Sequence, residues 1–272
     1  EEPDRVPVWG FGGDIVPAYS GYTNYDMCYD EEKTLKASEK FMRDFPFDSS
    51  MAGITGLDGR VFCMAFAEYD DLSPLMTFIT GPIHDILGDK YTRFPGREID
   101  KTAPAQFIGG TFMEPDEYDQ LIEDPVKFIA ETVLPRACKN LETPRQAMAT
   151  WVRLGMEIAR SGAFMAEFGK MNAELGYPPF PMGWGYAPLD IIGDFLRGVS
   201  NVVLDIRRYP DKVKKATEAI TEWMIKYALA YTKMGTKYAM FPLHLNEYLS
   251  PKLYNEFYWP YLKKVILALH EV

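Results

Sequence analysis

The sequence predicts an α/β fold with a parallel sheet, because short apolar strand candidates alternate with helix patterns along the chain. The length of 272 residues suits one large domain, and we expect residues 1–272 to form it. Hydrophobic residues make up 47% of the chain, which is enough for a sizeable core.

The first third of the chain mixes strand and loop patterns. Residues 6–9 are an apolar run that ends at a Gly-rich loop, which indicates a buried strand. A helix is expected over 31–45, capped by the Asp that precedes it. Further strands are expected at 48–54 and 59–67. The segment 70–105 is rich in Gly, Pro and Asp, and we interpret it as a long loop.

Two long helices are the clearest elements. Thr143-Pro144 opens the first, which runs toward Leu175, since a first-turn proline loses no needed N–H. In the second, over 211–234, apolar residues step by three and four and form one stripe. The stripe consists of Val213, Ala216, Ile220, Trp223, Tyr227, Ala230 and Met234.

The rest of the C-terminal half continues the alternation. An apolar, Gly-punctuated strand is expected at 180–186, a helix over 187–200, a strand at 238–243 and a helix from Ser250 onward. This gives five or six βα units, whereas a closed barrel requires eight. We therefore expect further strands beyond Val272 or from another chain.

Charge and cysteine content exclude several functional classes. The formal net charge is −10 and the basic residues are scattered, which disfavours binding to nucleic acid or to a membrane surface. No apolar run approaches the ~20 residues needed to span a bilayer. Cys28, Cys63 and Cys138 lie far apart and form no metal-binding or disulfide spacing, which is typical of a cytoplasmic protein.

Four segments resemble the uroporphyrinogen decarboxylase (URO-D) superfamily. They are DRVPVW at 4–9, MEPDEY at 113–118, LDIRRYPDKV at 204–213 and YLSPKLYNEFYWPYLKKVI at 248–266. The resemblance implies a (β/α)8 TIM barrel, here lacking its C-terminal strands.

The superfamily holds two chemistries, and the segment GGDIVPAY at 12–19 separates them. In the decarboxylase this place carries arginines that hold the carboxylates of a tetrapyrrole. Here it carries Asp14 and no arginine, which is electrostatically unfavourable for that substrate. The resemblance therefore points to the cobalamin-dependent methyltransferase branch, with tetrapyrrole decarboxylation or a non-catalytic barrel subunit as alternatives.

The methyltransferase branch implies a set of partners and cofactors. Methylcobalamin or a related corrinoid is expected on a separate corrinoid-binding protein, with a small-molecule methyl acceptor or donor such as a thiol, and a homodimer is possible. Zinc is expected to hold the thiol as a thiolate. The family's zinc ligands, a His-x-Cys pair and a later Cys, are expected beyond Val272, and the three cysteines of this chain do not match them.

Candidate catalytic residues follow the strand predicted at 238–243. His244, Asn246 and Glu247 lie where barrel strands end, and the carboxyl ends of barrel strands form the active-site face. We interpret His244 and Glu247 as catalytic and Asn246 as substrate-binding, with His244 also a possible metal ligand. The alternative for His244 is a core histidine bonded to a backbone carbonyl.

Other candidates lie at the ends of the strands predicted at 6–9 and 180–186. Asp14 is a catalytic candidate and Trp9 a substrate-binding one, although Asp14 could instead cap a turn. Trp184 and Tyr186 are substrate-binding candidates that could line a flat cofactor surface, although aromatic residues are more often part of a core.

Three charged residues and two histidines are expected at the surface. Asp190, Asp194 and Arg197 are spaced i, i+4 and i+7, which favours a solvated ion-pair face over an anion site. His84 and His270 are interpreted as surface residues.

Overall fold

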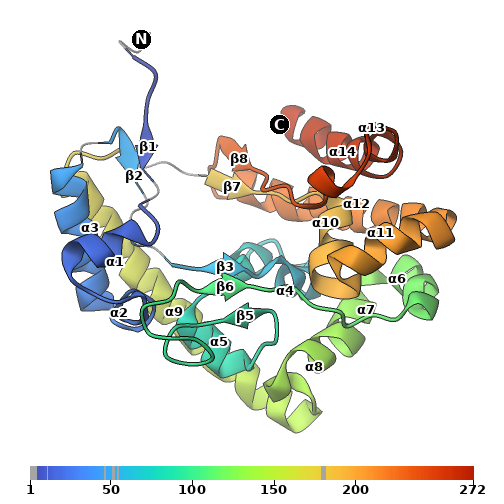
Figure 1. Ribbon diagram of the computed structural model, residues 1–272, viewed down its shortest axis with the longest axis horizontal. Helices are drawn as coiled ribbons and strands as arrows, with labels where there is room; N and C mark the ends of the chain where they lie inside the picture. Colours follow the sequence, from blue (N-terminus) through green and yellow to red (C-terminus); the bar gives the residue numbers. More distant parts are fainter. Residues whose placement is uncertain (1–4, 11, 46, 51–52, 54, 179–181) are drawn as a thin grey trace.

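The computed structural model describes residues 5–10, 12–45, 47–50, 53, 55–178 and 182–272. Parts of the strands predicted at 48–54 and 180–186 therefore lie outside the described residues. The described chain is a mixed α/β protein in which helices predominate and strands are short (Figure 1).

Two parallel strand pairs agree with the predicted parallel pairing. β1 (Trp9–Gly10) pairs with β2 (Ser49–Ser50), and β7 (Met182–Trp184) pairs with β8 (Tyr238–Met240). Each pair joins segments separated by helices, which is the arrangement of a βαβ unit.

Two antiparallel pairs complete the described strands: β3 (Leu57–Asp58) with β4 (Phe78–Ile79), and β5 (Thr92–Arg93) with β6 (Gln106–Phe107). The four pairs are separate two-stranded sheets. The described residues therefore do not close into a barrel, and the prediction of a (β/α)8 barrel is not confirmed. Each strand is only two or three residues long, which is too short to form a continuous ladder.

A small N-terminal layer surrounds β1 and β2. It contains α1 (Ile15–Ser20), α2 (Asn24–Tyr29) and α3 (Glu31–Asp44). The Asp30 side chain accepts a hydrogen bond of 3.0 Å from the backbone N–H of Lys33, which confirms the predicted cap of α3. This layer has its own apolar cluster, built on Val16, Met27, Ala37, Phe41 and Met42.

Residues 59–105 differ from the prediction. The strand expected at 59–67 is the helix α4 (Arg60–Ala65), because a short apolar run fits a buried helix as well as a buried strand. The expected loop contains η1 (Ser73–Met76), β4, α5 (Gly81–Leu87) and β5. His84 on α5 is buried, so its surface prediction was wrong, whereas His270 is exposed as predicted.

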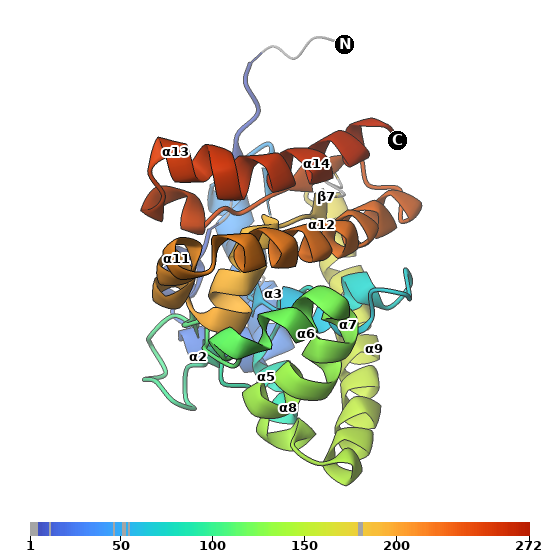
Figure 2. The same cartoon turned by 90° about the vertical axis from the view of Figure 1, so that its right-hand side faces the viewer.

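Short helical segments connect this region to the long helix α9. They are η2 (Pro115–Glu117), α6 (Tyr118–Glu123), α7 (Pro125–Phe128), η3 (Ile129–Val133), α8 (Leu134–Ala137) and η4 (Lys139–Leu141). Both long helices are confirmed: α9 spans Pro144–Glu174 and α12 spans Pro210–Lys233. α12 lies between α14 (Trp259–His270) and α6, as Figure 2 shows. Its predicted stripe is buried from Val213 to Ala230, whereas Met234 is exposed beyond the helix end.

The helix expected over 187–200 is divided. α10 (Pro188–Ile191) continues into the π-helical turn η5 (Ile192–Arg197), and Gly198, at a φ of 78°, separates it from α11 (Val199–Arg208). The π turn changes the directions in which the side chains point, and Asp190, Asp194 and Arg197 are all buried. The predicted solvated face was therefore wrong.

After β8 the chain passes through η6 (Leu245–Tyr248), α13 (Pro251–Leu253) and η7 (Tyr254–Tyr258) before α14. The helix predicted from Ser250 onward begins here, and the Ser250 hydroxyl caps α13. None of the described helices is long and apolar enough to span a membrane.

Candidate functional site

Two predicted site residues meet at the carboxyl ends of β7 and β8. Tyr186 lies two residues beyond β7, and His244 lies four residues beyond β8. Because the strands are parallel, both chain segments leave the pair at the same edge. The Tyr186 hydroxyl oxygen lies 2.7 Å from His244 Nδ1. Gly185 allows the segment after β7 to pack against Phe241, which follows β8, since a Cβ at Gly185 would collide with the Phe241 ring.

Asp194 on η5 joins the same group. The Tyr186 hydroxyl donates to Asp194 Oδ2 at 2.6 Å, and His244 Nδ1 lies 2.8 Å from the same oxygen. The hydrogen bond to Asp194 raises the pKa of His244 above its ordinary value, although burial opposes the charged form. A carboxylate facing Nδ1 selects the tautomer with the proton on that nitrogen, so Nε2 carries the lone pair.

His244 is open to solvent, whereas its partner is not. Its side chain is 41% exposed, against 5% for that of Asp194. Among the described residues, the hydrogen bonds of the His244 ring all involve Nδ1. Nε2 is therefore free to meet a substrate as a base or as a hydrogen-bond acceptor.

Asp190 holds the chain segment that carries His244. Its Oδ2 accepts from the backbone N–H of His244 at 2.9 Å and from the Tyr258 hydroxyl at 2.7 Å. Its Oδ1 accepts from the backbone N–H of Leu245 at 2.9 Å. Burial raises the pKa of Asp190 to about 6, even though all three hydrogen bonds favour the ionised form.

Arg60 connects this group to a cavity. Its guanidinium carbon lies 4.5 Å from the ring centre of Tyr186 and 5.7 Å from that of Trp184. The side chain is buried and forms an ion pair with Asp58. Trp184 also packs edge-to-face against Phe78 and lines the cavity. Arg60 therefore contacts both predicted aromatic site residues, Tyr186 and Trp184.

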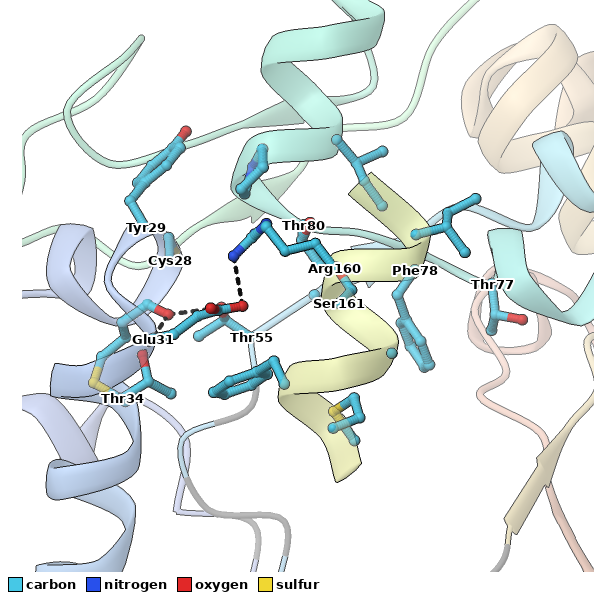
Figure 3. A pocket seen from close by; sticks show the side chains of 18 of the residues that line it. Cys28, Tyr29, Glu31, Thr34, Thr55, Thr77, Phe78, Thr80, Arg160 and Ser161 are labelled. Atoms are coloured by element: carbon cyan, nitrogen blue, oxygen red, sulfur yellow. Dashed lines mark hydrogen bonds and ion pairs between the residues drawn. The ribbon is translucent and has the colours of Figure 1, made fainter. Parts of the chain in front are cut away.

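The cavity has a volume of about 360 Å³ and lies between α2, the start of α3, the start of α5 and the middle of α9. Figure 3 shows the Arg160 side chain reaching from α9 toward Glu31 on α3. Arg160 lies 2.5 Å from a Glu31 oxygen and 2.6 Å from a Glu157 oxygen. The cation is therefore shared by two carboxylates.

The other predicted residues lie outside the hydrogen-bonded group. Asn246 and Glu247 are on η6, next to His244 in the chain, with Glu247 exposed. Trp9 lies in β1, and Asp14 is exposed at the start of α1, so both belong to the N-terminal layer.

Sequence reasoning missed four residues of the group: Asp190, Asp194, Arg60 and Tyr258. The two aspartates had a signal, because they precede a strand-end histidine that needs an acidic partner. The π turn concealed this signal, because a regular α-helix would have placed both aspartates on a solvated face. Arg60 had none, since its segment was interpreted as a strand.

The described residues do not gather a metal site: no three His, Cys, Asp or Glu side chains among them are placed to hold one ion. The three cysteines are buried, and burial raises the pKa of the Cys28 thiol to about 11 and that of Cys63 to about 12. Burial therefore favours the neutral thiol form of Cys28 and Cys63.

The His–Asp–Tyr group therefore lies at the carboxyl edge of a parallel strand pair in a mixed α/β protein. The family model of uroporphyrinogen decarboxylase (URO-D) matches residues 182–272, about a third of the chain. Over these residues the chain is similar to the URO-D family, whose members are generally enzymes. It covers Trp184, Tyr186, Asp190, Asp194, His244 and Tyr258. No curated protein matches the chain.

Proposed function

We propose that the protein is a methyltransferase that moves a methyl group between a corrinoid, held on a separate corrinoid-binding protein, and a small acceptor such as a thiol. The observation that carries the proposal is the geometry of His244. Asp194 and Tyr186 hold its Nδ1, while Nε2 is free among the described residues at an open strand edge.

This geometry suits the proton balance of methyl transfer. A thiol that takes up a methyl group forms a new S–C bond with its own electron pair and loses its proton. The corrinoid supplies the methyl group and keeps the electron pair of the broken bond. His244 Nε2 is the group placed to accept the proton, and the Asp194 carboxylate stabilises the imidazolium that results.

The charges around the site support methyl transfer over tetrapyrrole decarboxylation. A porphyrinogen with many carboxylates needs several unpaired cations. Arg60 is paired with Asp58, and Arg160 is paired with Glu31 and Glu157. Asp190 and Asp194 add negative charge beside His244, and this would repel such a substrate.

The barrel and zinc remain parts of this proposal. The two parallel pairs support a place for these strands in a (β/α)8 barrel. The described residues supply no complete set of zinc ligands, and His244 could contribute one ligand at most.

The experiment follows the visible absorbance of methylcobalamin with the purified protein and a panel of thiols. We expect conversion to the demethylated corrinoid only when protein and acceptor are both present. A parallel sample with a chelator tests the zinc requirement. A third sample receives uroporphyrinogen, and its turnover without any corrinoid reaction would overturn the proposal in favour of decarboxylation. A folded protein inactive in every sample would indicate a non-catalytic subunit.

A further inference from the structure

We propose that the cavity beside Trp184 is a binding site for an uncharged molecule with a single aromatic ring. This goes beyond the proposed function, because it concerns a cavity that His244 does not line. Its volume of about 360 Å³ lies at the small end of the range for small-molecule sites, roughly 300–1,000 Å³.

The walls of the cavity favour an aromatic ligand. Four aromatic side chains line it: Tyr29, Phe78, Phe164 and Trp184. Phe78 and Trp184 have ring centres 4.9 Å apart and planes at 88°, so they present an edge and a face at one corner. A flat ring can pack on both surfaces, and such aromatic pairs are stabilised beyond the burial of their area.

The charges of the cavity argue against an ionic ligand. Its charged lining residues are Asp30, Glu31 and Arg160. Asp30 caps α3 and contacts Lys33, while Arg160 binds Glu31 and Glu157. Neither a carboxylate nor an ammonium group would find an unpaired counter-charge on this lining. Either ion would lose its hydration without compensation.

One wall residue offers a polar contact. Thr80 stands at the N-cap position of α5 but caps nothing, and within the described structure its buried hydroxyl has no hydrogen-bond partner. A buried hydroxyl without a hydrogen-bond partner destabilises the protein, so a ligand that supplies a partner gains affinity. Rotation of this side chain would turn the hydroxyl toward the cavity, where a hydroxyl or ether oxygen of the ligand would satisfy it.

The test measures phenol binding by calorimetry, with benzoate and benzylammonium as charged counterparts of similar size. No corrinoid or methyl acceptor is added, so the result is independent of the proposed function. We expect phenol to bind and both ions to bind at least about tenfold more weakly, equivalent to about 1.4 kcal/mol. Equal or tighter binding of either ion, or no binding of phenol, would overturn the proposal.

A matched pair of variants on α9 locates the site. A Cβ at Gly162 or at Gly169 would meet no atom within 4 Å, yet only Gly162 lines the cavity. Both changes to leucine raise helix propensity, so both variants should fold. We expect Gly162→Leu to abolish phenol binding and Gly169→Leu to leave it unchanged. Wild-type affinity in folded Gly162→Leu would place phenol elsewhere and contradict the proposal.

The Thr80 contact has its own test. Thr80→Val removes the hydroxyl and keeps the shape of the side chain. We expect it to weaken the binding of phenol while leaving that of toluene unchanged. Equal effects on the two ligands would show that Thr80 makes no polar contact.

Discussion

His244 Nδ1 lies 2.8 Å from Asp194 Oδ2, although the two residues are 50 positions apart in the chain. The contact connects the segment after β8 to the π turn after α10. It also favours the charged imidazole, because the hydrogen bond to Asp194 raises the pKa of His244.

Replacing Asp194 should therefore change the titration of His244. Asp194→Asn keeps the shape of the side chain but removes its negative charge, so we expect the pKa of His244 to fall. A base must be neutral to accept a proton, so the rising limb of the activity profile should move to lower pH. NMR titration of the imidazole signals measures the shift. An unchanged pKa would show that Asp194 does not hold His244 in solution.

Asp190 should stabilise the fold because its carboxylate accepts hydrogen bonds from three donors. Asp190→Asn replaces one carboxylate oxygen by an NH₂ group, which then faces an N–H or O–H donor instead of accepting from it. A buried donor left without an acceptor costs about 1–3 kcal/mol. Because Asp190→Asn also removes a buried charge, which offsets part of this cost, the free energy of unfolding should fall by at most about that amount. Urea unfolding at pH 7.5 measures it. Glu247→Gln, on the exposed face of η6, is the control and should unfold like the wild type.

A second histidine predicts a pH dependence of stability. His84 Nδ1 lies 2.6 Å from Asp89, and Nε2 lies 3.1 Å from Glu98. Burial opposes the charged imidazole, but the hydrogen bonds and charges of the two carboxylates outweigh it and raise the pKa of His84.

Because the pKa of His84 is higher in the folded state, its stabilisation is fully present below the unfolded pKa of about 6.5. It is lost as the pH rises through the folded value. We expect His84→Gln to remove this loss, so that its unfolding free energy changes less than that of the wild type between pH 6 and pH 9. Urea unfolding measures both free energies. An equal change with pH in His84→Gln and in the wild type would contradict the raised pKa of His84.

The buried ion pair of Arg197 and Asp205 should be sensitive to the loss of one partner. Arg197 Nε donates to Asp205 at 2.8 Å, and Nη1 donates to the Met113 carbonyl at 2.6 Å. Arg197→Met leaves a buried carboxylate without its cation, which costs about 3–5 kcal/mol. Lys212→Met, which breaks an exposed pair with Asp119, is the control and should cost at most about 1 kcal/mol. Similar unfolding midpoints for the two variants would contradict this distinction.

Periodicity predicted the long helices well, because α9 and α12 are long enough for a repeated pattern to exclude a strand. It could not identify α4, whose six residues are buried almost throughout. The π turn of η5 was equally unpredictable, since i+4 spacing assumes a regular α-helix. As a result, Asp190 and Asp194 were assigned to solvent instead of to the site.

The candidate site was predictable only where strand ends defined it. Tyr186 and His244 meet because β7 and β8 pair in parallel. Trp9 and Asp14 also lie at the end of a parallel strand, but that strand is β1, which pairs with β2 in the N-terminal layer. Strand order in space is set by long-range packing, and no local pattern reports it.

The most direct test of methyl transfer at this site is the rate of methylcobalamin demethylation by His244→Gln with a thiol acceptor. Loss of a general base lowers rates by roughly 10²–10⁴-fold, and we expect a loss of that order at pH 7. The loss should shrink at high pH, where the thiol ionises without help. His270→Gln, at an exposed histidine, should react like the wild type. A wild-type rate for His244→Gln at pH 7 would contradict the role of His244.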